Sequence, residues 1–258
     1  MAPDYCAGIN QLREFARDDI PDYAQAQFAR GNYLLAANVA EADGSAPALA
    51  FAARARTADA IMRDTMCEPC LVDAEAAAAS AIKRDPSLAE GYIQLAVAIG
   101  FRGRLLGAVE AQSEGLAEKG REAIDRALEL DPLNLWGRAS LGGWHLEVVR
   151  RAGPILAKAM YGASEAEGLK HFRSALARAP ANPILHYHYA LSILALDADR
   201  FHNEALAALE TDQTEKRVDE LTKATRKRAA ELRIVLKTGT TDEIEALVRK
   251  FQGYPPES

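Results

Sequence analysis

Three proline-marked junctions recur at nearly constant spacing, and each closes an apolar segment with the period of an α-helix. The junctions are Asp85-Pro86, Asp131-Pro132 and Ala179-Pro180, so their prolines are 46 (132 − 86) and 48 (180 − 132) residues apart. Proline cannot continue a helix, because it lacks the backbone N–H and its ring clashes with the preceding turn. The recurrence of such segments therefore predicts a repeated pair of helices.

Small residues recur at fixed places around these junctions. Since alanine and glycine let two helix backbones approach closely, a recurring small residue indicates where the helices of a pair meet. The positions five before, twelve before and ten after each proline are small throughout: Ala81, Ala127, Ala175; Ala74, Gly120, Gly168; Ala96, Gly142, Ala190. Alanine also dominates stretches such as AEAAAASAIK, and it has the highest helix propensity.

In these features the sequence resembles the tetratricopeptide repeat family, whose second helix carries small, bulky and small residues and ends in Asp-Pro. The resemblance is specific from about residue 73 to residue 196, and Tyr33 and Ala36 fit a further unit upstream. Arg138 and His186 depart from the family pattern, which has an aromatic or aliphatic residue there. The family period is about 34 residues, so each unit is longer by about 12 to 14 residues. Split over two helices, this surplus predicts roughly two additional turns in each.

Long-helix variants of this repeat occur in two groups of proteins. The segments GGWHLEVVRR and YGASEAEGLKHFRSAL, with a break at Ala152-Gly153-Pro154 between them, look like those of regulator-of-microtubule-dynamics-like proteins. The periplasmic T-component of some TRAP transport systems has such repeats as well. The second resemblance implies a soluble accessory component of a small-molecule transport system.

The predicted fold is an all-α, tetratricopeptide-like α-α superhelix of about four extended helix pairs with a C-terminal capping helix. We expect one domain over residues 1–258, with an N-terminal extension (1–20), repeats (21–196), capping helices (197–251) and a tail (252–258). The segment TEKRVDELTKATRKRAAELRIVLK is helical and highly charged, so one face should cover the last pair while the other meets water. Its acidic and basic residues alternate at helical spacing, which is typical of an ion-paired surface.

The charge excludes some classes of partner. A formal net charge of −6 argues against a phosphate-binding surface, so no nucleic-acid partner is expected. No apolar run approaches the roughly 20 residues that span a bilayer, and no signal peptide is visible. We therefore expect a protein that does not span the membrane. It is cytoplasmic by default, or exported (periplasmic) if a leader was removed.

Cys67-Glu68-Pro69-Cys70 suggests redox or metal chemistry and is expected in a break between helices. Two thiolates are only half of the four ligands of a structural zinc site, and the sequence has no second CxxC or HxxxH pair. A dithiol–disulfide exchanger has this motif at the start of a helix that follows a strand, and no strand is predicted here. Three interpretations stay open: a functional thiol pair, a local disulfide in an exported protein, or two ordinary loop cysteines.

His171, His186 and His188 suggest a metal cluster. Residues two apart on a helix point about 200° from one another, so His186 and His188 cannot share one ion. His145 and Glu147 lack the second histidine of a zinc protease motif. Since no nucleophile, base and orienting group can be assembled from the spacing, we expect no metal, no cofactor and no catalytic residue.

In helical repeats, the first helices of successive pairs line a concave surface that recognises partners. The candidate binding residues there are mostly apolar: Ile93, Val97, Phe101, Trp136, Glu147, Ile184, Tyr187 and Leu191. An apolar groove predicts a partly apolar ligand, either a protein segment or a lipid-like small molecule. The leading hypothesis is a non-enzymatic binding or scaffold protein.

Alternatives to this hypothesis differ in class. One is a soluble accessory component of a transport system, which holds a small molecule in the bore formed by the long helices. Another is a thiol- or metal-dependent enzyme at Cys67 and Cys70. In a structural alternative, the extra helix length folds over the groove and fills it.

Overall fold

The protein is all-α, as the repeated helical pattern predicts. The computed structural model describes residues 20–63, 65–210 and 218–255, and these residues contain fourteen helices and no strand. The helices are α1 (Asp22–Ala29), α2 (Tyr33–Asp43), α3 (Ala46–Met62), α4 (Glu68–Arg84), α5 (Ala89–Leu105), α6 (Ala108–Ser113), α7 (Leu116–Leu130), α8 (Leu135–Ala152), α9 (Pro154–Tyr161), α10 (Glu165–Arg178), α11 (Pro183–Leu196), α12 (Ala198–Glu210), α13 (Glu220–Thr238) and α14 (Thr241–Gln252). The short helix expected within residues 1–20 lies outside the described residues, apart from Ile20.

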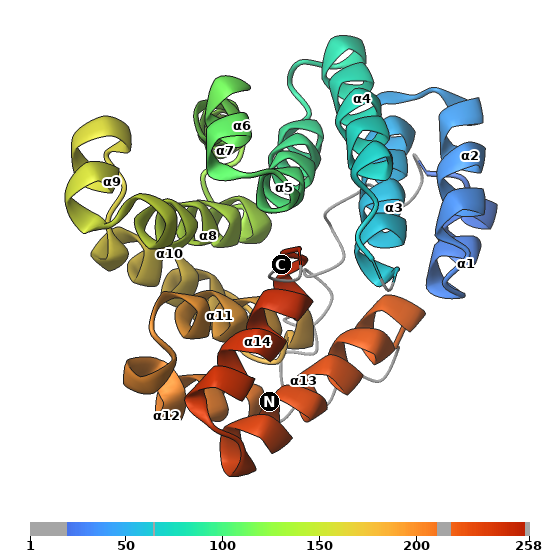
Figure 1. Ribbon diagram of the computed structural model, residues 1–258. Coiled ribbons are helices and arrows are strands. Elements are labelled where there is room, and N and C mark those ends of the chain that lie inside the picture. The colour runs from blue at the N-terminus through green and yellow to red at the C-terminus, as the bar shows by residue number, and fades with distance from the viewer. Residues whose placement is uncertain (1–19, 64, 211–217, 256–258) are drawn as a thin grey trace, which may run out of the picture.

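The long helices form an inner and an outer layer (Figure 1). The inner helices α3, α5, α8 and α11 each contact the next one in this order. The outer helix α4 packs between α3 and α5, α7 between α5 and α8, and α10 between α8 and α11. Each outer helix therefore fills the gap between two inner helices, which leaves the opposite side of the inner helices facing the centre of the molecule.

Helix α13 joins the two ends of this arrangement. It packs against α11, α12 and α14, and it also contacts α1 and α3. Leu221 packs against the core of the N-terminal helices, and the Arg228 guanidinium donates a hydrogen bond of 3.1 Å to the Ile61 carbonyl. The helix expected to cover only the last pair thus closes the inner layer into a ring, which Figure 1 shows as α3, α5, α8, α11 and α13 in succession.

The proline junctions end helices as predicted. Helices α4, α7 and α10 stop at Arg84, Leu130 and Arg178, each two residues before its proline. Because a proline disfavours the helical conformation of the residue before it, Asp85 adopts an extended conformation (φ −142°, ψ 98°). Asn134 then starts α8, since its side-chain oxygen accepts hydrogen bonds from the first-turn backbone N–H groups.

The surplus length of the repeats lies mainly in two inserted helices. Helix α6 lies between α5 and α7, and α9 lies between α8 and α10. Helices α7 and α10 are 15 and 14 residues long, so the prediction of about two additional turns in every helix was wrong. Gly107 and Gly153 precede α6 and α9, and Gly153 has a φ of 75°, which favours glycine where the chain leaves α8.

Close backbone contact occurs at the small residues. A Cβ atom added at Gly142 in α8 would lie 2.9 Å from the carbonyl oxygen of Gly168 in α10, and one added at Gly168 would lie 2.6 Å from Leu146. Real Cβ contacts are longer than these distances. The predicted close approach of paired helices at recurring small residues is therefore confirmed at this pair.

The buried core has two main parts. An alanine-rich cluster joins α1 to α4, and a cluster rich in leucine, tyrosine and phenylalanine joins α8 and α10 to α14. Smaller clusters on α5, α7 and α8 link them. No helix within the described ranges combines the length and the apolar character needed to cross a membrane.

Candidate functional site

A cavity of about 480 Å³ lies within the ring of inner helices. It is lined by residues of α3, α5, α8 and α11, together with residues of α6, α7 and α9 and with Leu221 of α13. This volume falls within the range of about 300 to 1,000 Å³ that is typical of small-molecule sites. Most of the lining residues are apolar.

Small residues on the inner helices leave this space open. Ala96 and Gly100 of α5 and Ala139 and Gly143 of α8 all line the cavity. A Cβ atom added at Gly100 would meet nothing within 4 Å, so the cavity reaches the backbone of α5 there. These residues have side chains too small to fill the centre of a ring of this size, and the central space therefore remains.

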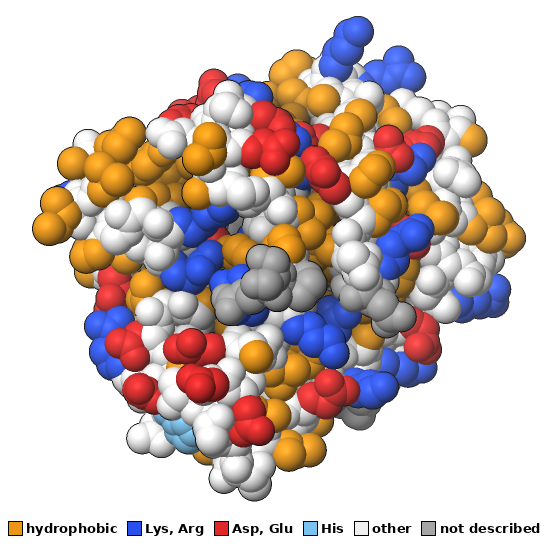
Figure 2. Space-filling model, viewed as in Figure 1, with side chains coloured by type: hydrophobic (Ala, Val, Ile, Leu, Met, Phe, Trp, Pro, Cys, Tyr) orange, Lys and Arg blue, Asp and Glu red, His pale blue; other side chains and the backbone are white. Residues whose placement is uncertain are grey.

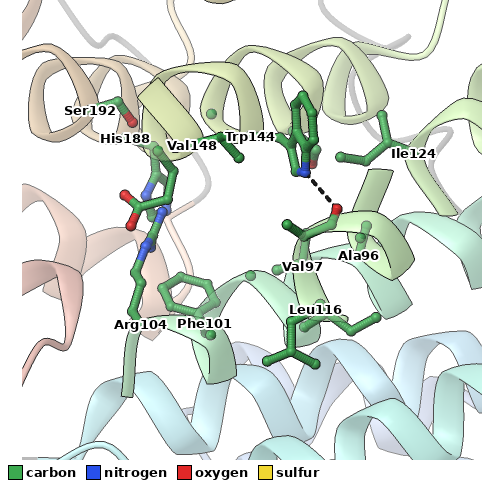
Figure 3. A pocket seen from close by; sticks show the side chains of 18 of the residues that line it. Ala96, Val97, Phe101, Arg104, Leu116, Ile124, Trp144, Val148, His188 and Ser192 are labelled. Carbon is green, nitrogen blue, oxygen red and sulfur yellow. Dashed lines mark hydrogen bonds between the residues drawn. The ribbon is translucent and has the colours of Figure 1, made fainter. Parts of the chain in front are cut away.

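One side of the cavity is apolar. Figure 3 shows Ala96, Val97, Leu116 and Ile124 on this side, with Trp144 beside them. The Trp144 indole N–H donates a hydrogen bond of 2.8 Å to the Ala117 carbonyl. Since its one polar group is satisfied by the protein, Trp144 offers an apolar ring to a ligand.

The opposite side of the cavity is polar. Arg104, His188 and Ser192 lie there (Figure 3), and Glu147 of α8 belongs to the same lining. The Glu147 carboxylate accepts a hydrogen bond of 2.9 Å from Arg150, and it also accepts one from the Tyr254 hydroxyl. Residues from α5, α8 and α11 and from the segment after α14 therefore meet at this end.

The charges at the polar end determine which groups ionise. Burial opposes ionisation of Glu147, but Arg104 and Arg150 outweigh it and lower the pKa of this carboxyl group. Burial lowers the pKa of His188 to about 4, and Arg104 and Arg228 contribute in the same direction. At neutral pH, Glu147 is consequently an anion and His188 is a neutral imidazole.

The cavity reaches the surface between α6 and α9. Ala108 and Gln112 of α6 and Leu156 and Met160 of α9 line it and are also exposed. Figure 2 shows hydrophobic side chains gathered over α9, where Ile155 is 86% exposed. The opening thus has an apolar rim, which suits the entry of an apolar molecule.

The structure separates the eight candidate binding residues into two groups. Those that line the cavity are Ile93, Val97, Phe101, Trp136, Glu147 and Ile184. Tyr187 and Leu191 do not line it, because α13 and α14 cover that face of α11 and bury both side chains. The Tyr187 ring packs against Phe251, and Gln252 donates a hydrogen bond to the Leu191 carbonyl.

Several lining residues were not among the candidates, and Arg104, Trp144 and His188 are three of them. Arg104 follows Phe101 by three residues and His188 follows Ile184 by four, so helical spacing could have found both. Trp144 precedes the candidate Glu147 by three residues, so the same spacing could have found it, although the expected stripe on α8 passes through Gly143 instead.

Cys67 and Cys70 form a disulfide, which is one of the three interpretations of the motif. Cys67 precedes α4, Pro69 lies in its first turn, and the Cys70 N–H donates to the Cys67 sulfur at 3.3 Å. The motif therefore opens a helix instead of only interrupting one, but this helix follows another helix and not a strand.

The disulfide predicts the number of reactive thiols. The chain has three cysteines, so the denatured protein purified without reductant should react with one equivalent of a thiol reagent (3 − 2 = 1), and with three after reduction. A Cys6→Ser variant should react with none before reduction. Three reactive thiols in the unreduced wild-type protein would contradict the bond.

The suggested cluster of His171, His186 and His188 does not form: the His171 ring stacks on that of His145, with their centroids 6.0 Å apart, and the other two lie elsewhere. His186 contacts the Pro180 carbonyl at 2.9 Å, His188 lies at the cavity, and the His145 Nδ1 atom accepts a hydrogen bond of 3.2 Å from the Ser164 N–H. Burial lowers the pKa of His145 to about 4, with Arg121 as the next contribution. Within the ranges that the structure describes, no group of three or more His, Cys, Asp or Glu side chains is placed to hold a metal ion.

Comparison with known proteins identifies no relative: no protein family model and no curated protein matches this chain. The geometry of the cavity is consequently the basis for the functional argument.

Proposed function

We propose that this is a non-enzymatic binding protein that holds a small, predominantly apolar molecule in the cavity within its ring of inner helices. The observation that carries the proposal is a cavity of about 480 Å³ whose lining is mostly apolar and comes from helices far apart in the sequence. Burial of apolar surface provides affinity in such a site, and a few polar groups orient the ligand.

The closure of the ring favours a small molecule over a protein segment. A scaffold of this kind holds a peptide along an open concave surface. Here α13 contacts both α11 and α3, and Tyr254 bonds to Glu147, so the inner face is covered on that side and is open between α6 and α9. Of the two ligands that an apolar groove predicts, the lipid-like molecule fits such a partly covered cavity better than an extended chain.

The helix pairs α3–α4, α5–α7 and α8–α10 are proposed to be tetratricopeptide-like units of a superhelix. Two features support this: successive inner helices contact one another with an outer helix between them, and small residues meet at Gly142 and Gly168. Helices α6 and α9 are then insertions within the second and third units.

A role as an accessory component of a transport system is the second candidate. The Cys67–Cys70 disulfide favours it, because disulfides persist mainly in oxidising compartments outside the cytosol. An exported protein that holds a small molecule in its cavity fits such a role. The same cavity would then carry the molecule to the transport system.

The substitution Gly100→Leu should place a side chain inside the cavity. A Cβ atom at Gly100 meets nothing within 4 Å, so the leucine side chain should enter the cavity without displacing other atoms. We expect the wild type to bind the neutral fluorescent probe N-phenyl-1-naphthylamine, and the variant to bind it at least about 10-fold more weakly, because overpacking costs roughly 1 to 3 kcal/mol. Fluorescence titration measures both affinities.

Gly107→Leu is the matched control. Gly107 also has open space at its Cβ position and has a φ of −61° that leucine can adopt, but it does not line the cavity. Its probe affinity should equal that of the wild type. Thermal unfolding should show that Gly100→Leu is at least as stable as the wild type, since leucine favours a helix more than glycine by roughly 0.5 to 1 kcal/mol. Equal probe binding by both variants would refute the proposed site.

A further inference from the structure

Arg104 is a half-buried cation that shares its nearest anion, Glu147, with Arg150. It lies in the last turn of α5, with its guanidinium carbon 5.1 Å from the centre of the Phe101 ring. Its Nε atom is buried and has no hydrogen-bond partner. No carboxylate within the described ranges lies within salt-bridge distance of it, but the Glu147 carboxylate, which pairs with Arg150, is close enough for Arg104 to lower its pKa. Two guanidinium groups therefore share one carboxylate, and one positive charge and the Nε donor are left over, so an added anion would bind favourably.

The lining of the cavity carries a surplus of positive charge. Glu147 is the one acidic residue among the described cavity-lining residues, whereas Arg54, Arg104 and Arg151 all line it. The Arg151 guanidinium is held by two neutral carbonyls, those of Gly103 (2.5 Å) and Leu106 (3.2 Å). This surplus contrasts with the net charge of −6 of the chain, and it favours an anionic ligand over a cationic one.

We propose that the ligand is an organic acid, and that Arg104 binds its carboxylate while its apolar body lies against Leu116, Ile124 and Trp144. Figure 3 shows Arg104 and His188 on the side of the cavity opposite these three residues, so a single molecule can reach both. This assignment rests on the proposed function, since it names the class of molecule that the same cavity holds.

The number of available donors favours a carboxylate over a phosphate. A guanidinium presents two parallel N–H groups that match the two oxygens of a carboxylate. A phosphate monoester brings a charge of about −1.5 to −2, which the one surplus positive charge of Arg104, Arg150 and Glu147 does not neutralise. The His188 ring contacts Phe101 and Tyr187, and as a neutral imidazole it can donate one further hydrogen bond to the same carboxylate.

The test compares an acid with its uncharged counterpart. Dodecanoic acid and 1-dodecanol share the same chain, and each can displace N-phenyl-1-naphthylamine from the wild type at neutral pH. We expect the acid to bind at least about 10-fold more tightly, because hydrogen bonds to charged groups are stronger than those to neutral groups. Arg104→Met keeps the length of the side chain but removes its charge. This variant should bind dodecanoic acid about 10-fold more weakly or worse, while its affinity for 1-dodecanol should change by less than about twofold.

Two further variants make the result specific. Arg126→Met removes an exposed arginine that pairs with Glu129 outside the cavity, and it should leave both affinities unchanged. Arg104→Lys retains the charge and should retain the preference for the acid, which guards against a fold defect in Arg104→Met. Circular dichroism checks the fold of each variant.

The outcomes separate the two proposals. A wild type that binds the acid and the alcohol equally, or an Arg104→Met variant that binds the acid as the wild type does, overturns the assignment of an organic acid. The apolar cavity remains the binding site in both of these cases. A wild type that binds neither the neutral probe nor either chain overturns the proposed function itself.

Discussion

Replacing Leu232 with alanine is expected to lower the free energy of unfolding by about 2 to 5 kcal/mol. Leu232 lies in α13 and is 0% exposed. It belongs to the core cluster of α8 and α10 to α14, so its removal leaves a cavity that the surrounding helices cannot fill completely. Chemical denaturation followed by circular dichroism measures the change.

The control is two residues further along the same helix. Ile234 is 63% exposed, and Ile234→Ala should change the free energy of unfolding by no more than about 0.5 kcal/mol. The difference tests whether this highly charged helix is part of the fold that closes the ring. If both substitutions have equally small effects, α13 does not pack as described and does not bound the cavity.

Replacing the adjacent glycines Gly142 and Gly143 of α8 with alanine should change the free energy of unfolding in opposite directions. At Gly142 the new Cβ atom would lie 2.7 Å from the Phe172 ring and 2.9 Å from the Gly168 carbonyl oxygen, so α8 and α10 must separate. We expect Gly142→Ala to destabilise the protein by roughly 1 to 3 kcal/mol. At Gly143 the nearest contact is 3.7 Å, and Gly143→Ala should stabilise it by about 0.5 to 1 kcal/mol, because alanine favours a helix more than glycine.

Thermal unfolding of these two variants is sufficient to measure the contrast. Both replace glycine by alanine within one helix, so helix propensity contributes equally, and only the contact with α10 differs. Stabilisation by Gly142→Ala would show that the helices do not approach as closely as described. Destabilisation by Gly143→Ala would instead show that the cavity side of α8 is packed, contrary to the proposed site.

The two glycines also relate stability to function. Gly142 faces α10 and allows the pair to pack, whereas Gly143 lines the cavity and leaves space for a ligand. The same helix therefore uses small residues for opposite purposes on its two sides. Leucine at Gly100 is expected to fill part of the cavity from α5, and Arg104, one turn further on, is the residue that we propose selects the ligand.

The helices that carry the site could be predicted because the signals are local. A proline stops a helix wherever it occurs, and an asparagine side chain can cap the first turn of the next one. Accordingly, α4, α7 and α10 end before the three junction prolines, and Ile93, Val97 and Phe101 lie together on the inner side of α5. These results need no knowledge of distant contacts.

The residues of α11 that face the cavity could not be predicted from local spacing alone. From Ile184, helical spacing permits either Tyr187 and Leu191 or His188 and Ser192 to face inward. The first set is more apolar and resembles a groove, but α13 and α14 cover it. His188 and Ser192 face the cavity instead. Apolar character indicates burial, and it does not distinguish a ligand from another helix of the same chain.

The sequence by itself determined that the chain is all-α, where most of its helices begin and end, and which small residues bring paired helices together. These properties follow from backbone stereochemistry and from the spacing of side chains within about one helical turn. Only the tertiary structure decided that α13 returns to α1 and α3, that the surplus length lies in α6 and α9, and that Arg104 and Arg150 share the carboxylate of Glu147. Each of these depends on contacts between residues far apart in the chain, whose geometry is set by the packing of all the helices together.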